Sequence, residues 1–139
     1  MRSAVNFGYA FCLALAIGTP AGARPDVTCL MGPFILYFDH GSSKLDARSK
    51  SILDEAVKLY GECGPARTQI DGYTDTSEPR PLSRKRAIAA RAYLAKAGLP
   101  TGDIMIRGSG GDRLRVPTPP NTPEGQNRRV VITYGPPSE

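Results

Sequence analysis

An aspartate and an arginine on either side of a short turn are the residues in this sequence best suited to bind a charged ligand. Asp75 ends an alternating segment, and Arg86 lies in the first turns of a predicted helix that opens with Leu82. A carboxylate can accept hydrogen bonds from an ammonium group, and a guanidinium can grip a carboxylate with its planar fork. The pair therefore suits a zwitterionic ligand. An internal Asp75–Arg86 salt bridge is the alternative, since exposed ion pairs are common and contribute roughly 0–1 kcal/mol.

The elements that must position these two residues alternate between strands and helices. Apolar or alternating runs predict strands at residues 33–38, 68–74, 104–107 and 128–134. Helical spacing predicts one helix from an N-cap at Asp46 to Tyr60, and an alanine-rich helix from Leu82 to near Gly98. The order β-α-β-α-β-β predicts an α/β fold, an α+β sandwich whose mixed sheet carries both helices packed on one face.

Two glycine- or proline-rich segments connect the later elements. Residues 108–110, Gly-Ser-Gly, predict a tight turn directly after the third strand. The segment between Gly110 and Asn127 contains four prolines, and its length is unusual for a small domain. Such a loop favours a role in binding or at the rim of a site, and a rigid surface connection is an equally good interpretation.

The N-terminal residues resemble a secretory signal peptide. Arg2 supplies a positive charge, residues 7–18 are mostly apolar, and residues 21–23 form an A-x-A cleavage pattern. We therefore predict a signal peptide at residues 1–23 and one domain at residues 24–139, without a transmembrane segment in the mature chain. An uncleaved anchor is the alternative. Phe11 precedes Cys12 where a lipoprotein signal needs a small residue, so lipidation is not expected.

Two cysteines remain after the predicted cleavage, Cys29 and Cys63. An exported protein meets an oxidising environment in which disulfides form. If the first helix packs back against the first strand, both cysteines return to the same end of the domain. The sequence thus predicts a Cys29–Cys63 disulfide, which would close a loop of about 34 residues and contribute on the order of 3–4 kcal/mol.

Charge and composition narrow the function further. The chain has 18 basic and 13 acidic residues, a net charge of +5, which suits an anionic polymer such as the cell wall. Nucleic acid is disfavoured by the predicted export and by the lack of a basic stripe interleaved with aromatic residues. His40 is the only histidine, so neither a metal centre nor a Cys–His catalytic pair is expected, and we predict no cofactor and no enzymatic activity.

Four motifs, in this order, resemble the OmpA-like domain, the C-terminal, peptidoglycan-binding domain of outer membrane protein A. Their residues are Tyr37-Phe38-Asp39 at the end of the first strand, Thr74-Asp75, Leu82-Ser83-Arg84-Lys85-Arg86-Ala87, and Asn127-Arg128-Arg129-Val130. The resemblance covers roughly residues 33–134. Each motif is weak by itself, and their common order makes the resemblance specific.

The resemblance implies non-covalent binding of peptidoglycan through the meso-diaminopimelate of its stem peptide. Asp75 is then expected to take the ammonium group of the ligand and Arg86 its carboxylate. Residues that wall or adjoin the pocket complete the implied set of ligand-binding residues, which is Asp75, Arg86, Phe38, Asp39, Leu82 and Arg128. The implied location is the periplasm, in association with the outer membrane or cell wall, with peptidoglycan and other envelope proteins as partners.

One departure from the family pattern bears on the ligand. Between Asp75 and Leu82 the family carries a longer insert, by roughly one helical turn, whereas here only residues 76–81 remain, with prolines at 79 and 81. A shorter and stiffer loop reshapes the rim of the pocket. The alternative function is therefore an OmpA-like periplasmic domain for protein interaction, or a scaffold, that has lost peptidoglycan binding.

Overall fold

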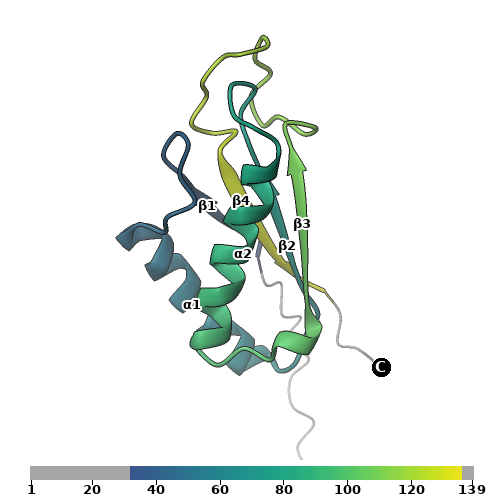
Figure 1. Cartoon of the computed structure of the whole chain (residues 1–139). Helices are drawn as coiled ribbons and strands as arrows, with labels where there is room; N and C mark the ends of the chain where they lie inside the picture. The colour runs from purple at the N-terminus through teal and green to yellow at the C-terminus, as the bar shows by residue number, and fades with distance from the viewer. Residues whose placement is uncertain (1–31, 136–139) are drawn as a thin grey trace, which may run out of the picture.

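Four strands form one mixed sheet in the computed structural model, which describes residues 32–135 (Figure 1). The elements, in chain order, are β1 (Phe34–Tyr37), α1 (Ala47–Cys63), β2 (Thr68–Tyr73), α2 (Pro81–Lys96), a short 3-10 helix η1 (Thr101–Asp103), β3 (Ile104–Gly110) and β4 (Arg129–Tyr134). The spatial order of the strands is β1-β4-β2-β3. β4 is antiparallel to both β1 and β2, whereas β2 and β3 are parallel. Both helices cover the same face of the sheet, which confirms the predicted fold (Figure 1).

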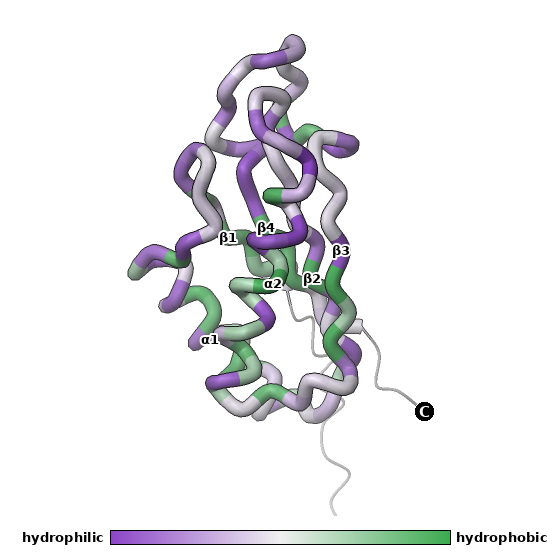
Figure 2. The backbone as a smooth tube through the Cα atoms, in the orientation of Figure 1, coloured by the Kyte–Doolittle hydropathy of each residue, from purple (hydrophilic) through white to green (hydrophobic). Residues whose placement is uncertain are grey.

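The core lies between this face of the sheet and the two helices. Leu36, Ile70 and Ile132 of the sheet meet Leu53 of α1 and Leu94 of α2, and all five side chains are fully buried. Hydrophobic residues recur along the strands and helices, whereas the loops beyond the tip of β3 are polar or intermediate in hydropathy (Figure 2). The sheet and helices therefore form the base from which the loops at the Asp75 end extend.

Helix α1 begins as the sequence predicts and ends later. The Asp46 side chain accepts a hydrogen bond from the Ser49 N–H at 2.7 Å, which satisfies a free donor of the first turn. The helix continues through Gly61 and stops only where Gly64 adopts a positive φ of 88°, so the predicted end at Tyr60 was wrong. A left-handed backbone at this position is what glycine tolerates best.

The tight turn predicted at residues 108–110 is also wrong. These residues belong to β3, because Gly108 pairs with Gly72 and Gly110 with Tyr73 of the neighbouring strand β2. Their hydrogen bonds with β2 outweigh the weak strand propensity of glycine, which is context-dependent.

Two of these strand glycines let α2 lie very close to the sheet. A Cβ atom at Gly72 would stand 1.9 Å from the Ser83 carbonyl oxygen, and one at Gly108 would stand 2.8 Å from the Arg84 backbone nitrogen. Glycine in a strand often marks a place where another backbone approaches closely. The close approach carries the first turns of α2, and with them Arg86, over the end of β2.

Several predictions concern residues outside the described range. The predicted signal peptide at residues 1–23 and Cys29 lie there. Cys63, at the end of α1, is disulfide-bonded, and its pairing with Cys29 stays a prediction. Among residues 32–135, none of the helices has the length and apolar character needed to span a membrane.

Candidate ligand-binding site

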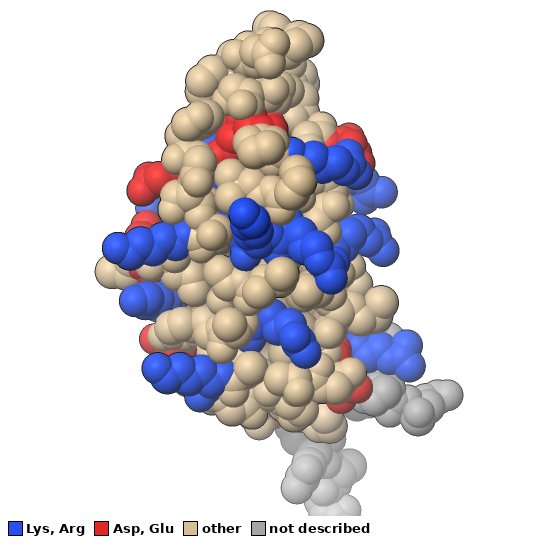
Figure 3. All heavy atoms as spheres, viewed as in Figure 1, with Lys and Arg blue, Asp and Glu red and all other residues tan. Residues whose placement is uncertain are grey.

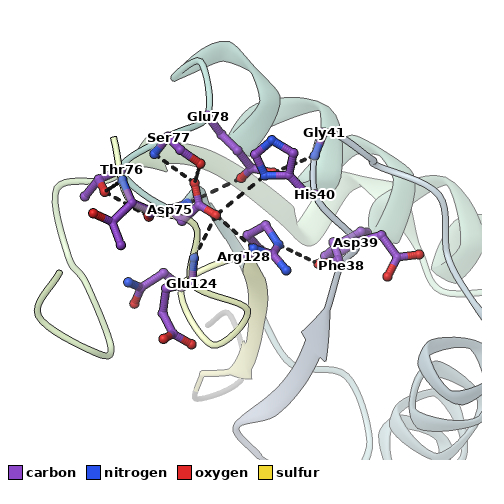
Figure 4. Close-up of polar contacts among 12 residues, drawn as sticks. Phe38, Asp39, His40, Gly41, Asp75, Thr76, Ser77, Glu78, Glu124 and Arg128 are labelled. Carbon is purple, nitrogen blue, oxygen red and sulfur yellow. Dashed lines mark hydrogen bonds and ion pairs between the residues drawn. The ribbon is translucent and has the colours of Figure 1, made fainter. Parts of the chain in front are cut away.

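Asp75 lies directly beyond β2 with its carboxylate buried, at 1% exposure. Its Oδ1 accepts hydrogen bonds from the backbone N–H and the hydroxyl of Ser77, at 2.9 and 2.7 Å. Its Oδ2 accepts from the Glu124 N–H at 3.1 Å and from Arg128 Nη1 at 2.9 Å. Figure 4 shows the carboxylate at the centre of these contacts. Asp75 therefore organises the residues that follow β2 and the loop that precedes β4.

Arg128 connects Asp75 to the end of β1. While its Nη1 donates to Asp75, its Nε donates to the Phe38 carbonyl oxygen at 3.0 Å (Figure 4). The structure thus brings Phe38 and Arg128 beside Asp75. Their separation in sequence is large, and the antiparallel pairing of β1 with β4 is what makes them neighbours.

Arg86 projects from α2 into the same end of the domain and is fully buried. Its Nε donates to the Ser42 carbonyl at 2.8 Å, and its Nη1 and Nη2 donate to the carbonyls of Tyr73 and Asp39 at 3.1 and 3.2 Å. The guanidinium also lies 5.3 Å from the centre of the Phe38 ring. Arg86 therefore ties three separate chain segments together around the site.

Glu78 is the residue with which Arg86 forms its ion pair. The two carboxylate oxygens accept one hydrogen bond each from Nη1 and Nη2, both at 2.7 Å, and both side chains have 0% exposure. Glu78 also accepts from the Gly41 N–H at 2.8 Å and from the Asp75 N–H at 3.3 Å. A buried pair of this kind persists because each charge is compensated by its partner and by further hydrogen bonds.

The alternative of a direct Asp75–Arg86 salt bridge is wrong for this structure. Asp75 pairs with Arg128, Arg86 pairs with Glu78, and Glu78 links the two pairs through the Asp75 N–H. Glu78 lies three residues after Asp75, in the loop between β2 and α2, within reach of the Arg86 guanidinium.

The other predicted site residues lie at the same end. Leu82 is buried in the first turn of α2, and Phe38 is buried at the end of β1. Asp39 takes part through its backbone carbonyl, whereas the residue as a whole is exposed. The set of site residues predicted from the sequence did not include Glu78 or His40. No local pattern identifies Glu78, because its spacing from Arg86 does not match a helical or strand neighbour.

His40 covers the two buried carboxylates from the solvent side. Its Nδ1 lies 3.8 Å from Asp75 Oδ2 and 3.8 Å from Glu78 Oε1, and 56% of its side chain is exposed (Figure 4). Two hollows open at this end of the domain. One of about 330 Å³ is lined by residues 74–76, Glu78, Arg80, Gly111, Thr118 and Pro120, and one of about 340 Å³ is lined by residues 37–39, Lys44, Asp46 and residues 124–126. Asp75 and Glu78 therefore line the first hollow, and Phe38 and Asp39 line the second.

The long loop before β4 is held by polar contacts. The buried Asn127 side chain accepts from the Arg115 and Val116 N–H groups at 2.7 and 2.9 Å and donates to the Val116 carbonyl at 2.8 Å. The Thr76 hydroxyl donates to the Pro119 carbonyl at 2.6 Å. These contacts place the Glu124 N–H against Asp75, so the loop forms part of the rim of the site.

His40, Asp75 and Glu78 also form a group that could hold a metal ion, because their ligand atoms lie within 4.8 Å of one another. The donor set does not favour one. Both carboxylates already carry a guanidinium partner at 2.9 Å or less, and the two positive charges would repel a cation. The absence of a metal stays a prediction for this protein.

The pKa of Asp75 reflects competing effects. Burial raises it, but hydrogen bonds from Ser77, Arg128 and the Glu124 N–H outweigh burial and lower the pKa from 3.8 to about 2. Because the folded pKa lies below the unfolded value, the ionised group stabilises the fold above pH 3.8, and this contribution is lost as the pH falls through 2. Its size is about 2 kcal/mol.

We therefore expect Asp75→Asn to lower the free energy of unfolding by about 2 kcal/mol at pH 7. The difference from the unsubstituted protein should shrink between pH 4 and pH 2. Urea unfolding at pH 7, 4, 3 and 2 measures both quantities. A difference that stays constant over this range would contradict the lowered pKa.

The sequence of this chain matches a known protein family. The model of the family described as "OmpA family" matches residues 37–129, which is well over half of the chain. The chain belongs to the OmpA family. The match spans the end of β1, the Asp75 turn, the first turns of α2 and the loop before β4. It confirms the family resemblance that the four motifs indicate.

Individual proteins with similar sequences or structures support the same family assignment. An "Outer membrane protein" of Gluconacetobacter diazotrophicus is 39% identical over 109 residues, covering 71% of this chain and 29% of that protein. A "Peptidoglycan-associated lipoprotein" of Brucella melitensis is 29% identical over 123 residues, covering 86% of this chain and 72% of that protein. The crystal structure of the peptidoglycan-associated lipoprotein from Burkholderia pseudomallei has the same fold, with a TM-score of 0.67, 22% identity, and coverage of 76% of this chain and 92% of that chain. This chain thus spans less than a third of the first relative.

Proposed function

We propose that this OmpA-family domain binds peptidoglycan non-covalently in the periplasm, through the diaminopimelate of the stem peptide. The observation that carries the proposal is the buried carboxylate of Asp75, held ionised at the mouth of a pocket in a chain related to peptidoglycan-associated lipoproteins. A buried, hydrogen-bonded carboxylate is a strong acceptor for an ammonium group. The predicted signal peptide supports export, and the domain acts as a binding module without a catalytic step.

Asp75 receives the ammonium group of the ligand in this proposal. The approach is from the side of His40, whose exposed ring stands 3.8 Å from Asp75 Oδ2 and turns aside when the ligand enters. Phe38 and the Asp39 backbone wall the pocket, and Arg128 holds the Asp75 carboxylate in place. Arg86 and Leu82 support the same wall from α2.

The surface charge suits an anionic polymer. Lys and Arg side chains are spread over the face that carries α2 (Figure 3), where Arg84, Lys85 and Lys96 are exposed. Exposed cations of this kind raise the rate of encounter with an anionic surface and act over about a Debye length, roughly 10 Å at moderate salt. They assist binding without deciding which group of the wall is recognised.

We expect Asp75→Asn to weaken wall binding roughly tenfold to a hundredfold, because one charge-assisted contact contributes about 1.5–3 kcal/mol. The experiment is co-sedimentation of the protein, purified after expression and export of the full chain, with purified diaminopimelate-type peptidoglycan. Asp54→Asn is the matched control, because Asp54 is an exposed carboxylate of α1 that accepts a hydrogen bond from the Tyr93 hydroxyl. Both variants should first be shown to be folded by circular dichroism.

A second candidate function is a domain for protein interaction in the envelope that no longer binds the wall. One observation favours it: the Asp75 carboxylate already accepts four hydrogen bonds within the chain, and the Arg86 ion pair with Glu78 is internal. Protein that stays in the supernatant with peptidoglycan, while folded, would support this second function and exclude the first. Equal pelleting of Asp75→Asn and the unsubstituted protein would exclude Asp75 as the receptor.

A further inference from the structure

Glu78 brings a carboxylate of the chain itself to the place where a ligand carboxylate would meet Arg86. The bidentate pairing, with both distances at 2.7 Å and both side chains at 0% exposure, is the geometry in which a guanidinium binds a planar carboxylate most strongly. A residue outside the ion pair also holds Glu78 in place, because the Gly41 N–H donates to its carboxylate at 2.8 Å. The turn that carries Glu78 is braced by Pro79 and by Pro81, the first residue of α2.

All N–H donors of Arg86 are used within the chain. A guanidinium has five N–H groups and no others to offer. Nε is used by the Ser42 carbonyl, one Nη1–H each by the carbonyl of Tyr73 and by Glu78, and one Nη2–H each by the carbonyl of Asp39 and by Glu78. No donor of Arg86 is left for a ligand, so a ligand carboxylate can bind there only by displacing Glu78.

Such displacement is unfavourable. Glu78 is tethered to the site by a short loop with two prolines, so its local concentration at Arg86 is far above that of any ligand group in solution. If it left, its own carboxylate would stay next to the incoming one, and like charges at this distance repel each other. The Glu78 carboxylate therefore remains in place when a ligand approaches.

The two carboxylate oxygens that lie beneath His40 favour a positive charge alone. Glu78 Oε1 and Asp75 Oδ2 face the same point on the solvent side, where each lies 3.8 Å from His40 Nδ1. An ammonium group at that point can donate to both oxygens. A carboxylate attached beside this ammonium would find no free donor on Arg86 and would meet the Glu78 carboxylate instead.

We infer that Glu78 is the specificity residue of the pocket, and that the pocket selects a ligand ammonium whose neighbouring carboxyl group is amidated or absent. This inference rests on the proposed function, since it names the form of the stem-peptide amine that the same site takes. Glu78 acts by occupying Arg86 and by supplying a second acceptor for the ammonium.

The test compares two stem-peptide fragments that differ in a single group. One carries free meso-diaminopimelate, and the other carries diaminopimelate with the carboxyl next to its side-chain amine converted to a carboxamide. Isothermal titration calorimetry with the unsubstituted protein should give a dissociation constant at least about tenfold lower for the amide. Equal affinity, or tighter binding of the free acid, overturns the inference and leaves the proposed function intact. Binding of neither fragment overturns both.

Glu78→Gln gives a second readout. A glutamine keeps the size of the side chain but has one acceptor oxygen in place of two, so one N–H of Arg86 becomes free for a ligand carboxylate. We expect the preference to shift towards the free acid by about tenfold or more relative to the unsubstituted protein. Glu55→Gln, at an exposed position of α1, makes the same change of charge, serves as the matched control and should leave the preference unchanged. An unchanged preference in folded Glu78→Gln would show that Glu78 does not set specificity.

Discussion

Replacing Arg86 with methionine is expected to lower the free energy of unfolding by about 3–5 kcal/mol, because it leaves the Glu78 carboxylate buried without a partner. Three backbone carbonyls would lose their donor as well. A domain of this size has a total stability of roughly 5–15 kcal/mol, so the variant should lose a large share of its stability. Urea unfolding followed by circular dichroism measures the change.

The double substitution Arg86→Met with Glu78→Met distinguishes the cost of an unpaired buried charge from the cost of losing the Arg86 side chain. Replacing both charges by apolar groups of similar size is often neutral or stabilising, so the double variant should recover the part of the loss that comes from the unpaired Glu78 charge. The part that remains reports the carbonyls of Ser42, Tyr73 and Asp39, which stay without their donor. Arg107→Met is the matched control, since Arg107 is 63% exposed and lies 3.9 Å from Asp71. That variant should change stability by about 1 kcal/mol at most. A loss below about 1 kcal/mol for Arg86→Met would contradict the buried pair.

Gly72→Ala should have the second-largest effect, a loss of about 3 kcal/mol or more. The added Cβ atom would meet the Ser83 carbonyl oxygen at 1.9 Å, and both atoms belong to rigid elements, so α2 must move away from β2. The same movement withdraws Arg86 from the carbonyls of Ser42 and Tyr73. Thermal unfolding monitors the stability, and the co-sedimentation assay described above monitors the site.

A glycine in an open position provides the control for Gly72. Gly61 lies inside α1, and an added Cβ there meets nothing within 4 Å. Gly61→Ala should therefore stabilise the domain by about 0.5–1 kcal/mol, since alanine has the higher helix propensity. If both glycine variants change stability by the same small amount, the close approach of α2 to β2 is not required for the fold.

These expectations connect the fold to the site through one helix. Glycines on β2 and β3 admit α2, the first turns of α2 carry Arg86 and follow the Glu78 turn, and Arg86 draws the loop after β1 towards the end of β2. The site is therefore built at the place where three chain segments converge. A substitution that shifts α2 should weaken stability and ligand binding together.

Much of the fold is determined by the sequence itself, because local signals agree with one another. Asp46 is an N-cap whose side chain accepts a hydrogen bond from the backbone N–H of Ser49, three residues later. Alternating apolar residues such as Val130 and Ile132 identify a strand with one buried face. The motif residues Asp75 and Arg86 are also recognisable, since they stand at fixed positions relative to a strand end and a helix start. The gathering of these residues at one end of the sheet follows from the order of the elements.

The partners of the charged residues were decided only by the tertiary structure. Arg128 reaches Asp75 because β4 pairs with β1, and Glu78 reaches Arg86 because the loop between β2 and α2 places its side chain in the interior. Neither contact follows from a helical or strand periodicity of the sequence, because each depends on how the loops pack against the assembled sheet. The sequence alone therefore identifies a guanidinium suited to a carboxylate. The folded chain decides that this carboxylate is the protein's own, because a tethered group outcompetes a free one.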